Sequence, residues 1–379
     1  KMTDLPEHQF NTSFLTKHFS NLQDPRRTDK GNLRHRLSDI LLLVLSAVLS
    51  RCQEWDEIIL FGSQELDWLK KHGSFDNGIP SKDTLRRFFA ALDPESFQAC
   101  FVQWISTFRN EVLLEVVSID GKTIRGASTK SDTESISPHI ISALASEQGL
   151  CLGQIKVEDK SNEITAIPKL LNSLSIENCT ITIDAMGCQT EIIKTIRSNQ
   201  ANYIVAVKGN QGQLYQAIKD AFMLEKPIDT GTDNDCGHGR VEKRTCHVYS
   251  DMSHLENHQR WKDLKTFIII EKEVFYKATQ ETKNEMRYYI SNLNISASQI
   301  NTMVREHWAI ENKLHWVLDV VFEEDYARKR IGNSAENFNL VLKMALLLIN
   351  KEKTFKKSKN NKRLKALLDR EYREKLMMF

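Results

Sequence analysis

Two short apolar stretches that each end in a single aspartate constrain the fold of this chain more than any other feature. Leu113–Ala127 reads LLEVVSIDGKTIRGA, and its β-branched run stops at Asp120. Cys179–Gly187 reads CTITIDAMG, a second alternating run that stops at Asp184. Because Asp-Gly after a strand is also a common turn signal, Asp120 alone is weak evidence. Two buried strands that each deliver a carboxylate to a sheet edge predict a metal site.

The composition is typical of a soluble globular protein. The 379 residues are enough for two or three domains, and 41% hydrophobic with 27% charged residues is ordinary. A formal charge of +2 is nearly neutral, so a polyanionic partner must be bound by local basic patches. Seven cysteines without a CxxC pair indicate reduced thiols in a cytoplasmic protein. The run Ile40–Leu49 has about half the ~20 residues that a membrane span needs.

The first 112 residues show the apolar spacing of helices and form the predicted helical N-terminal domain. Helices are expected from Ser38 or Asp39 through Leu49, over Trp55–Trp68, and over Lys82–Leu92, with Ser81 as N-cap. The third of these carries Arg86 and Arg87. A helix-turn-helix DNA reader and a plain helical bundle with a solvated basic face are both compatible with this pattern.

From Val116 onward, predicted strands alternate with helices, which indicates an α/β protein. The order is that of a ribonuclease-H-like mixed sheet flanked by helices, here with a β-rich insertion. We expect catalytic-core segments at 113–225 and 293–352, an insertion at 226–292, and a basic tail at 353–379. The predicted strands beyond the two aspartate strands are His139–Ala145, Leu152–Val157, Tyr203–Val207, Glu242–Tyr249, Thr266–Glu271 and Arg287–Ile290. The predicted helices are Glu163–Leu174, Gln189–Ser198, one from residue 212 to about Met223, Ala297–Val320 and Ser334–Asn350.

The helix predicted over Ala297–Val320 supplies a third candidate ligand. His307, Glu311 and His315 are spaced i, i+4, i+8 and share one face. A His-Glu-His zinc site is one interpretation, although no HExxH or CxxC element accompanies it. Glu311 as partner of Asp120 and Asp184 in a site for hard divalent ions is another. A surface acid on an amphipathic helix is the third, and the residues alone leave all three open.

Eight segments, in this order, carry a resemblance to a known family: IDGKTIRGA, HIISA, DKSNEITAIPKLL, ITIDAMGCQ, YIVAVKGNQG, HGRVEKR, RYYISNL and HWAIENKLHWVLDVVFEED. The chain resembles the H-repeat-associated, Rhs-element-linked transposases of bacterial insertion sequences, which belong to the DDE transposase superfamily. The resemblance implies a ribonuclease-H-like catalytic domain with a β-strand insertion between the second Asp and the Glu. It also implies Mg²⁺-dependent cleavage and joining of DNA ends, with two metal ions that Mn²⁺ can replace.

Carried over residue by residue, the resemblance places the catalytic and metal-binding triad on Asp120, Asp184 and Glu311. Related transposases carry Arg four residues before the Glu and Lys seven after it. This chain has His307 and Leu318 there, and Arg305 is the nearest substitute for the Arg. Asp319 and Asp325 follow on or near the same helix, so Glu311 is the least secure of the three assignments.

Double-stranded DNA, both transposon ends and target, is the implied partner, and synapsis of two ends implies a homodimer near the nucleoid. Lys122, Arg125, Lys208 and Asn210 are expected at the sheet edge beside the triad. Trp308 and Trp316 are interpreted as core residues. The remaining expected DNA contacts, any of which is equally compatible with a solvated face, are Arg26, Arg27, Arg86, Arg87, His238, Arg240, Arg305, His307 and the lysines of 353–365.

Two alternatives keep the same fold. One is a domesticated DNA-binding relative without turnover. The other is a metal-dependent nuclease that cuts DNA without joining it. The presence of all three carboxylates favours a catalytically competent enzyme over the first.

Overall fold

The computed structural model describes residues 14–26, 33–130, 135–157, 163–237, 239–255 and 257–378. The chain divides into two compact units. The helical unit comprises Lys1–Arg109, Thr123–Ile140 and Trp316–Phe379, and the sheet unit comprises Asn110–Lys122 and Ile141–His315. Within the described ranges, every helix is too short or too polar to traverse a lipid bilayer. All seven cysteines are free thiols, five of them buried.

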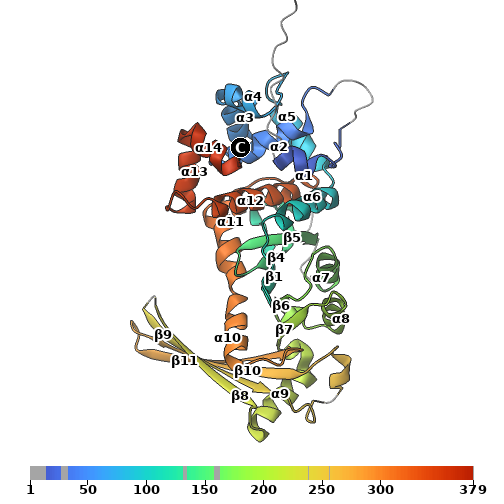
Figure 1. The fold of residues 1–379 in the computed structure, drawn as a ribbon, viewed down its shortest axis with the longest axis vertical. Coiled ribbons are helices and arrows are strands. Elements are labelled where there is room, and N and C mark those ends of the chain that lie inside the picture. The colour runs from blue at the N-terminus through green and yellow to red at the C-terminus, as the bar shows by residue number, and fades with distance from the viewer. Residues whose placement is uncertain are drawn as a thin grey trace, which may run out of the picture. The chain divides into compact units, whose positions relative to one another are not determined.

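A nine-stranded mixed sheet organises the sheet unit, in the order β5-β4-β1-β6-β7-β11-β10-β9-β8 (Figure 1). β1, β6 and β7 are parallel, and β11 runs antiparallel to β7. β4 and β5, the neighbouring strands predicted at His139–Ala145 and Leu152–Val157, are joined by the turn Ser146–Gly149 as a hairpin. The strands of the first half are β1 Val116–Thr123, β4 His139–Ala145, β5 Leu150–Val157, β6 Thr180–Ile183 and β7 Asn202–Val207.

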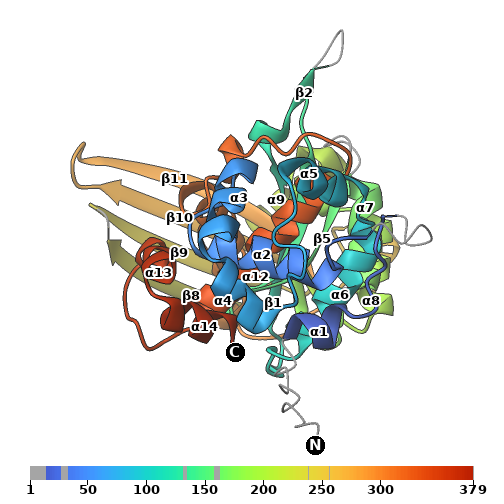
Figure 2. The same ribbon diagram turned by 90° about the horizontal axis from the view of Figure 1, so that it is seen from above.

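The segment predicted as a β-rich insertion extends this same sheet. β8 Asp229–Gly237, β9 Arg240–Tyr249, β10 Thr266–Tyr276 and β11 Glu281–Ser291 form an antiparallel ribbon of long strands (Figure 2). Helix α10, Ala297–Glu306, packs on β8 and β9. A buried cluster that includes Ile204, Cys246, Ile268 and Ile300 joins α10 to the sheet. The apolar half of the ribbon therefore forms one core with the parallel strands.

The other helices of the sheet unit confirm the α/β alternation predicted between the parallel strands. α7 Glu163–Asn172 contacts β5, and α8 Thr190–Ser198 contacts β7. α9, Gly212–Leu224, follows β7 through a short 3₁₀ turn at Gly209–Gln211. The isoleucines of α8 are fully buried, whereas Glu191 and Lys194 are exposed, as expected for an amphipathic helix on a sheet.

The helical unit contains the N-terminal helices and the C-terminal ones. Ser81 caps α5 by accepting a hydrogen bond from the Thr84 N–H at 3.2 Å, which confirms the predicted cap. The helix predicted over Trp55–Trp68 is wrong as one element, because α3 ends at Gln64 and Glu65 leaves helical geometry before α4 begins. The bounds are α1 Phe14–Phe19, α2 Leu37–Leu49, α3 Trp55–Gln64, α4 Leu66–His72, α5 Lys82–Ala91 and α6 Pro94–Ser106, with the two-residue strands β2 Thr129–Lys130 and β3 Ser135–Ile136.

α12, Ser334–Lys351, is the buried centre of the helical unit and contacts α2, α5 and α6. The segment 353–379 is not a tail, since it forms α13 Lys359–Leu368 and α14 Arg370–Met377. Lys362, one of the lysines expected to contact DNA or solvent, is buried, and so is its neighbour Arg363. The Arg363 guanidinium donates to the carbonyl of Val48 at 2.9 Å. Basic side chains can be buried here because backbone carbonyls at the ends of α2 and α12 accept their hydrogen bonds.

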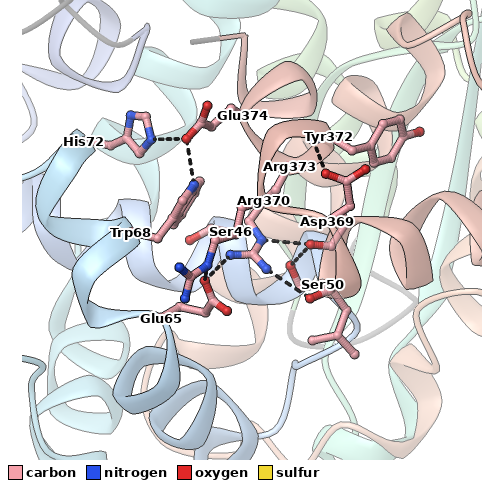
Figure 3. A network of polar contacts seen from close by, with 12 residues as sticks. Ser46, Ser50, Glu65, Trp68, His72, Asp369, Arg370, Tyr372, Arg373 and Glu374 are labelled. Atoms are coloured by element: carbon pink, nitrogen blue, oxygen red, sulfur yellow. Dashed lines mark hydrogen bonds and ion pairs between the residues drawn. The ribbon is translucent and has the colours of Figure 1, made fainter.

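A network of polar contacts attaches α14 to the N-terminal helices (Figure 3). Arg373 is fully buried between the rings of Phe61 and Trp68. Its guanidinium is 2.8 Å from a carboxylate oxygen of Glu65. Glu374 accepts from the indole N–H of Trp68 at 3.0 Å. The last described helix is therefore an integral part of the helical unit.

Candidate active site

The parallel pairing of β1 with β6 brings the two predicted aspartates together. The register aligns Val116 with Thr180 and Ile119 with Ile183. Asp120 is the next residue of β1 and Asp184 directly follows β6, and neighbouring strands lie about 4.8 Å apart. Burial along β1 changes at this point, from fully buried residues to partly exposed ones. The two carboxylates therefore emerge side by side where the sheet core ends.

Asp184 also fixes the turn that follows it. Its carboxylate accepts hydrogen bonds from the backbone N–H groups of Met186 at 3.0 Å and Gly187 at 3.4 Å, and so caps the short 3₁₀ turn Ala185–Gly187. A Cβ at residue 187 would lie 2.2 Å from the Ile183 side chain. Only glycine allows this turn to pack so closely on β6. The turn holds the Asp184 carboxylate in one place.

Glu311 lies on a π-helical segment, Ile310–His315, and not on a continuous α-helix. The prediction of one helix from Ala297 to Val320 is therefore wrong: α10 ends at Glu306, and α11 comprises only Trp316–Val320. Ile310 and Leu314 are buried and anchor the segment, while Glu311 is exposed. π-helical turns are rare and occur frequently at functional sites because they redirect one side chain.

All three predicted carboxylates line one pocket of about 390 Å³ in the sheet unit. Although Glu311 is exposed as a residue, partial desolvation of its carboxyl in the pocket raises its pKa, and the negative charge of Asp120 adds to this effect. Burial likewise raises the pKa of Asp184, with further contributions from Asp120 and Glu163 that the N–H groups of Gly187 and Met186 oppose. The three acids therefore share one pocket, where the charge of Asp120 disfavours the ionised forms of both Asp184 and Glu311, and a bound cation would relieve this repulsion.

Two histidines support the carboxylates from the same chain segment. His307 contacts the hydroxyl of Thr182 through Nδ1 at 3.0 Å. Burial lowers the pKa of His307 although Asp120 and Asp184 favour its charged form, so the imidazole is neutral near pH 7. His315 Nδ1 lies 3.4 Å from an oxygen of Asp120. His307 therefore contacts β6 and His315 contacts β1. The two imidazoles do not form the shared His-Glu-His face that a continuous helix would have presented.

Carboxylate oxygens are the donors that Mg²⁺ and Mn²⁺ prefer, so the donor set fits a divalent cation of this class. Over the described ranges, no group of three or more His, Cys, Asp or Glu side chains lies close enough to hold one ion. This finding also gives no support to the His-Glu-His zinc interpretation. The residues fit a divalent cation in two respects: their carboxylate oxygens are suitable ligands, and Asp120, Asp184 and Glu311 line a common pocket.

The basic residues predicted beside the triad separate in the structure. Lys208 lines the carboxylate pocket, whereas Lys122 and Asn210 are not among its lining residues. The Asn210 amide instead donates to the carbonyl of Ala185 at 2.6 Å and braces the turn after Asp184. Arg125 belongs to the helical unit, where its N–H donates to Asp325. Of this group, Lys208 alone is a pocket residue.

Other predicted DNA contacts are engaged within the protein. Arg305 forms ion pairs with Asp233 at 2.8 Å and with Asp235. Arg26 is largely buried and pairs with Asp24 at 2.6 Å. Arg86 lies 3.5 Å from Asp83, and Arg87 donates to the Asp83 carbonyl. Arg27 and His238 lie outside the described residues.

Sequence reasoning missed Arg287 and misjudged one tryptophan. Arg287, on β11, lines the carboxylate pocket and stacks over the Trp308 ring at 4.8 Å. Its Nε is 2.8 Å from Glu285, which lowers the pKa of that carboxyl. Arg287 is the first residue of the RYYISNL motif, but a single Arg in a predicted strand does not indicate a functional site. Trp316 was expected in the core and is 57% exposed.

Comparison with known proteins gives consistent matches over nearly the whole chain. The family model described as Transposase DDE domain matches residues 113–348, and the one described as DDE_Tnp_1-associated matches residues 16–105. "Putative transposase YncI" of Escherichia coli O157:H7 is 40% identical over 373 residues, 96% of this chain and 94% of that protein. "H repeat-associated putative transposase YhhI" of Escherichia coli K12 is 39% identical, covering 94% of this chain and 96% of that protein. A cryo-EM structure of a piggyBac transposase synaptic complex with hairpin DNA aligns with a TM-score of 0.45 and 11% identity, covering 97% of this chain and 77% of that one, which is too distant to bear on fold or function.

Proposed function

This chain belongs to the DDE transposase family, and on that premise we propose that it cleaves DNA at the ends of an insertion sequence and joins those ends to target DNA. The observation that carries the proposal is the convergence of Asp120, Asp184 and Glu311 on one pocket. The sheet order β5-β4-β1-β6-β7, with three parallel strands, supports a ribonuclease-H-like core for this chemistry.

Asp120, Asp184 and Glu311 would hold the divalent cations, two Mg²⁺ ions or Mn²⁺ in their place. When bound, such ions activate an attacking water or 3′-hydroxyl and stabilise the leaving oxygen of an in-line phosphodiester displacement. The chain itself supplies the positioning. The turn capped by Asp184 fixes one carboxylate, and the neutral His307 adds no positive charge that would repel the cations.

Lys208 is the cation best placed to bind the phosphate that reacts, because it lines the same pocket as the carboxylates, whereas Arg287, which also lines it, pairs with Glu285. Lys122, Asn210, Arg125, Arg86 and Arg87 remain proposed contacts to the rest of the DNA. The partner in this proposal is double-stranded DNA, and a homodimer would hold two element ends together near the nucleoid.

The test uses the full chain, a labelled duplex that carries the element's own terminal sequence, and a supercoiled target plasmid. With Mg²⁺ or Mn²⁺ the wild type should produce joined product, and EDTA should abolish it. Asp184→Asn and Glu311→Gln should lower joining by more than about 100-fold, the upper range for loss of a group that supports a metal site. The matched control is Asp220→Asn, an acid on α9 that does not line the pocket.

Three outcomes would contradict the proposal. Full joining by Asp184→Asn would remove the carboxylate from the mechanism. Nicked DNA without joined product from the wild type would support a nuclease that cuts only. Tight binding of the ends with no product under any metal would support a domesticated DNA-binding protein.

A further inference from the structure

One face of the β8–β11 ribbon changes from apolar to charged along its length. Alternate residues of β9 point to the same side, so Cys246 and Val248 share a face with Arg240, Glu242 and Arg244. The first two belong to the buried cluster under α10. The other three lie farther along the strand, past the packed part of the helix, and line a second pocket of about 580 Å³.

The strand register adds more charges to this face. Lys272 of β10 pairs with Arg244, and Arg287 of β11 pairs with Ile270, two residues before Lys272 on the same side. Arg305 reaches the pocket from α10, and Lys313 reaches it from the π-helical segment. The lining thus contains six cationic side chains and two carboxylates. When Asp233 and Glu285, which pair with Arg305 and Arg287, are included, two cations remain in excess.

The cations of this pocket are incompletely neutralised. Arg244 is 4% exposed, and its Nε makes no hydrogen bond although the Glu242 carboxylate is 3.4 Å away. Burial lowers the pKa of Arg244, and the positive charges of Arg287 and Arg305 add to this effect against the opposing charge of Glu242. The exposed Arg240 side chain has no ion-pair partner within the described residues. A buried guanidinium with an unmet donor favours an anion that brings several acceptor oxygens.

The second pocket adjoins the carboxylate pocket, since Arg287 and Trp308 line both. We propose that the second pocket binds the phosphodiester backbone of the DNA strand whose reacting phosphate lies at Asp120, Asp184 and Glu311. This inference rests on the proposed function and specifies the path of the strand. Phosphate oxygens fit the site because guanidinium groups bind them in bidentate fashion.

Asp235 acts in this proposal as the internal counterion that DNA replaces. Asp235 lies on the exposed edge strand β8, and its carboxylate pairs with Arg305 of α10. A phosphate that binds Arg305 competes with this carboxylate. Removing the Asp235 charge should therefore strengthen DNA binding more than removing an acid elsewhere on the ribbon.

The chain offers charge-matched controls on the opposite face of the same strands. Lys243 is exposed on β9, on the same strand face as Val241 and Thr245, and it is the register partner of Glu273 on β10. Neither lines the second pocket. Arg240→Gln and Lys243→Gln change the net charge equally, and so do Asp235→Asn and Glu273→Gln. Any difference within a pair therefore reports position and not overall charge.

The experiment measures binding of the full chain to a fluorescein-labelled DNA strand and to its duplex by anisotropy. A KCl series in EDTA separates binding from catalysis. A lost phosphate contact lowers the salt slope by about 0.9 on duplex or 0.7 on single-stranded DNA, which corresponds to about five- to eightfold weaker binding near 0.1 M salt. We expect this for Arg240→Gln and an unchanged slope for Lys243→Gln. Asp235→Asn should bind more tightly than Glu273→Gln.

Equal effects of Arg240→Gln and Lys243→Gln would overturn the inference in favour of a diffuse positive surface, and no effect of either would overturn it outright. The result is separable from the proposed function. A wild type that binds DNA through Arg240 but never joins ends would retain this pocket and lose the transposition chemistry. If the wild type joins ends and Arg240→Gln also binds and joins normally, the transposition chemistry would be retained and the proposed role of the second pocket would be lost.

Discussion

Glu352, the residue that follows α12, offers a quantitative test of how the C-terminal helices are attached. It is 7% exposed. Its carboxylate accepts hydrogen bonds from the N–H groups of Thr354 at 2.7 Å and Phe355 at 3.1 Å and from the Tyr372 hydroxyl at 2.9 Å. The Lys362 ammonium lies 3.3 Å away. Glu352→Gln keeps the size of the side chain and removes its charge.

The magnitude follows from the pKa of Glu352. Burial alone would raise this pKa, but hydrogen bonds from Thr354, Phe355 and Tyr372 outweigh burial and lower it from 4.5 to about 2. Because the folded protein binds the proton more weakly than the unfolded chain, the charged carboxylate stabilises the fold above about pH 4.5. That contribution is about 3 kcal/mol at pH 7 and is lost as the pH falls from 4.5 towards 2.

Urea unfolding at pH 7 and near pH 3 measures the effect. Glu352→Gln should be less stable than the wild type by about 3 kcal/mol at pH 7 and by about 1–1.5 kcal/mol near pH 3. Other titrating groups cancel because only the difference between the two proteins is used. Glu371→Gln, on the exposed side of α14, should change stability by less than about 0.5 kcal/mol. A loss that stays constant between the two pH values would refute the reasoning.

Two further substitutions test particular contacts. Arg373→Met removes a fully buried guanidinium that donates to the Glu65 carboxylate and to the carbonyls of Ala366 and Leu367, and it should cost about 3–5 kcal/mol in urea unfolding. Arg370→Met removes only an exposed partner of the same Glu65 oxygen and should cost less than about 1 kcal/mol. Equal losses would show that burial of the guanidinium is unimportant. Gly187→Ala places a methyl group 2.2 Å from the side chain at the end of β6 and should lower stability by about 1–3 kcal/mol and impair strand transfer. Gly209→Ala is the control, because its added methyl group meets no described atom within 4 Å. If Gly187→Ala were as stable and as active as Gly209→Ala, the turn after Asp184 would tolerate a side chain.

The sequence was sufficient for the features that depend on local periodicity and on strand order. Alternating β-branched residues located both strands, and their parallel pairing placed Asp120 beside Asp184. The second strand ends just before Asp184 as expected, whereas β1 continues past Asp120 to Thr123. The pattern of strands and helices along the chain predicted a mixed α/β sheet, and the structure adds the spatial order of its strands around β1. Ser81 as an N-cap was predictable for the same reason, since capping is a contact within four residues.

Features set by distant contacts could not be predicted in this way. The π-helical segment that carries Glu311 follows a pattern compatible with a continuous α-helix, and the break depends on how Ile310 and Leu314 are buried. Arg287 reaches the carboxylate pocket only because β11 pairs with β7, a pairing that brings together residues from two predicted segments. Arg363 lies in the segment predicted as a basic tail, and its guanidinium is satisfied in the interior by a carbonyl more than 300 residues away in the chain.

The two positions where the resemblance led us to expect Arg and Lys carry no solvated cation in this chain. The His307 ring is held against Thr182 beside two carboxylates. Leu318 is 1% exposed, so an ammonium there would need a buried carboxylate partner. The cations in and next to the carboxylate pocket are instead Lys208 after β7, Arg287 on the ribbon and Arg305 on α10, and the two arginines pair with carboxylates of the same unit. If phosphates replace those carboxylates, positive charge next to the carboxylate pocket comes from strands and helices other than the one that carries Glu311.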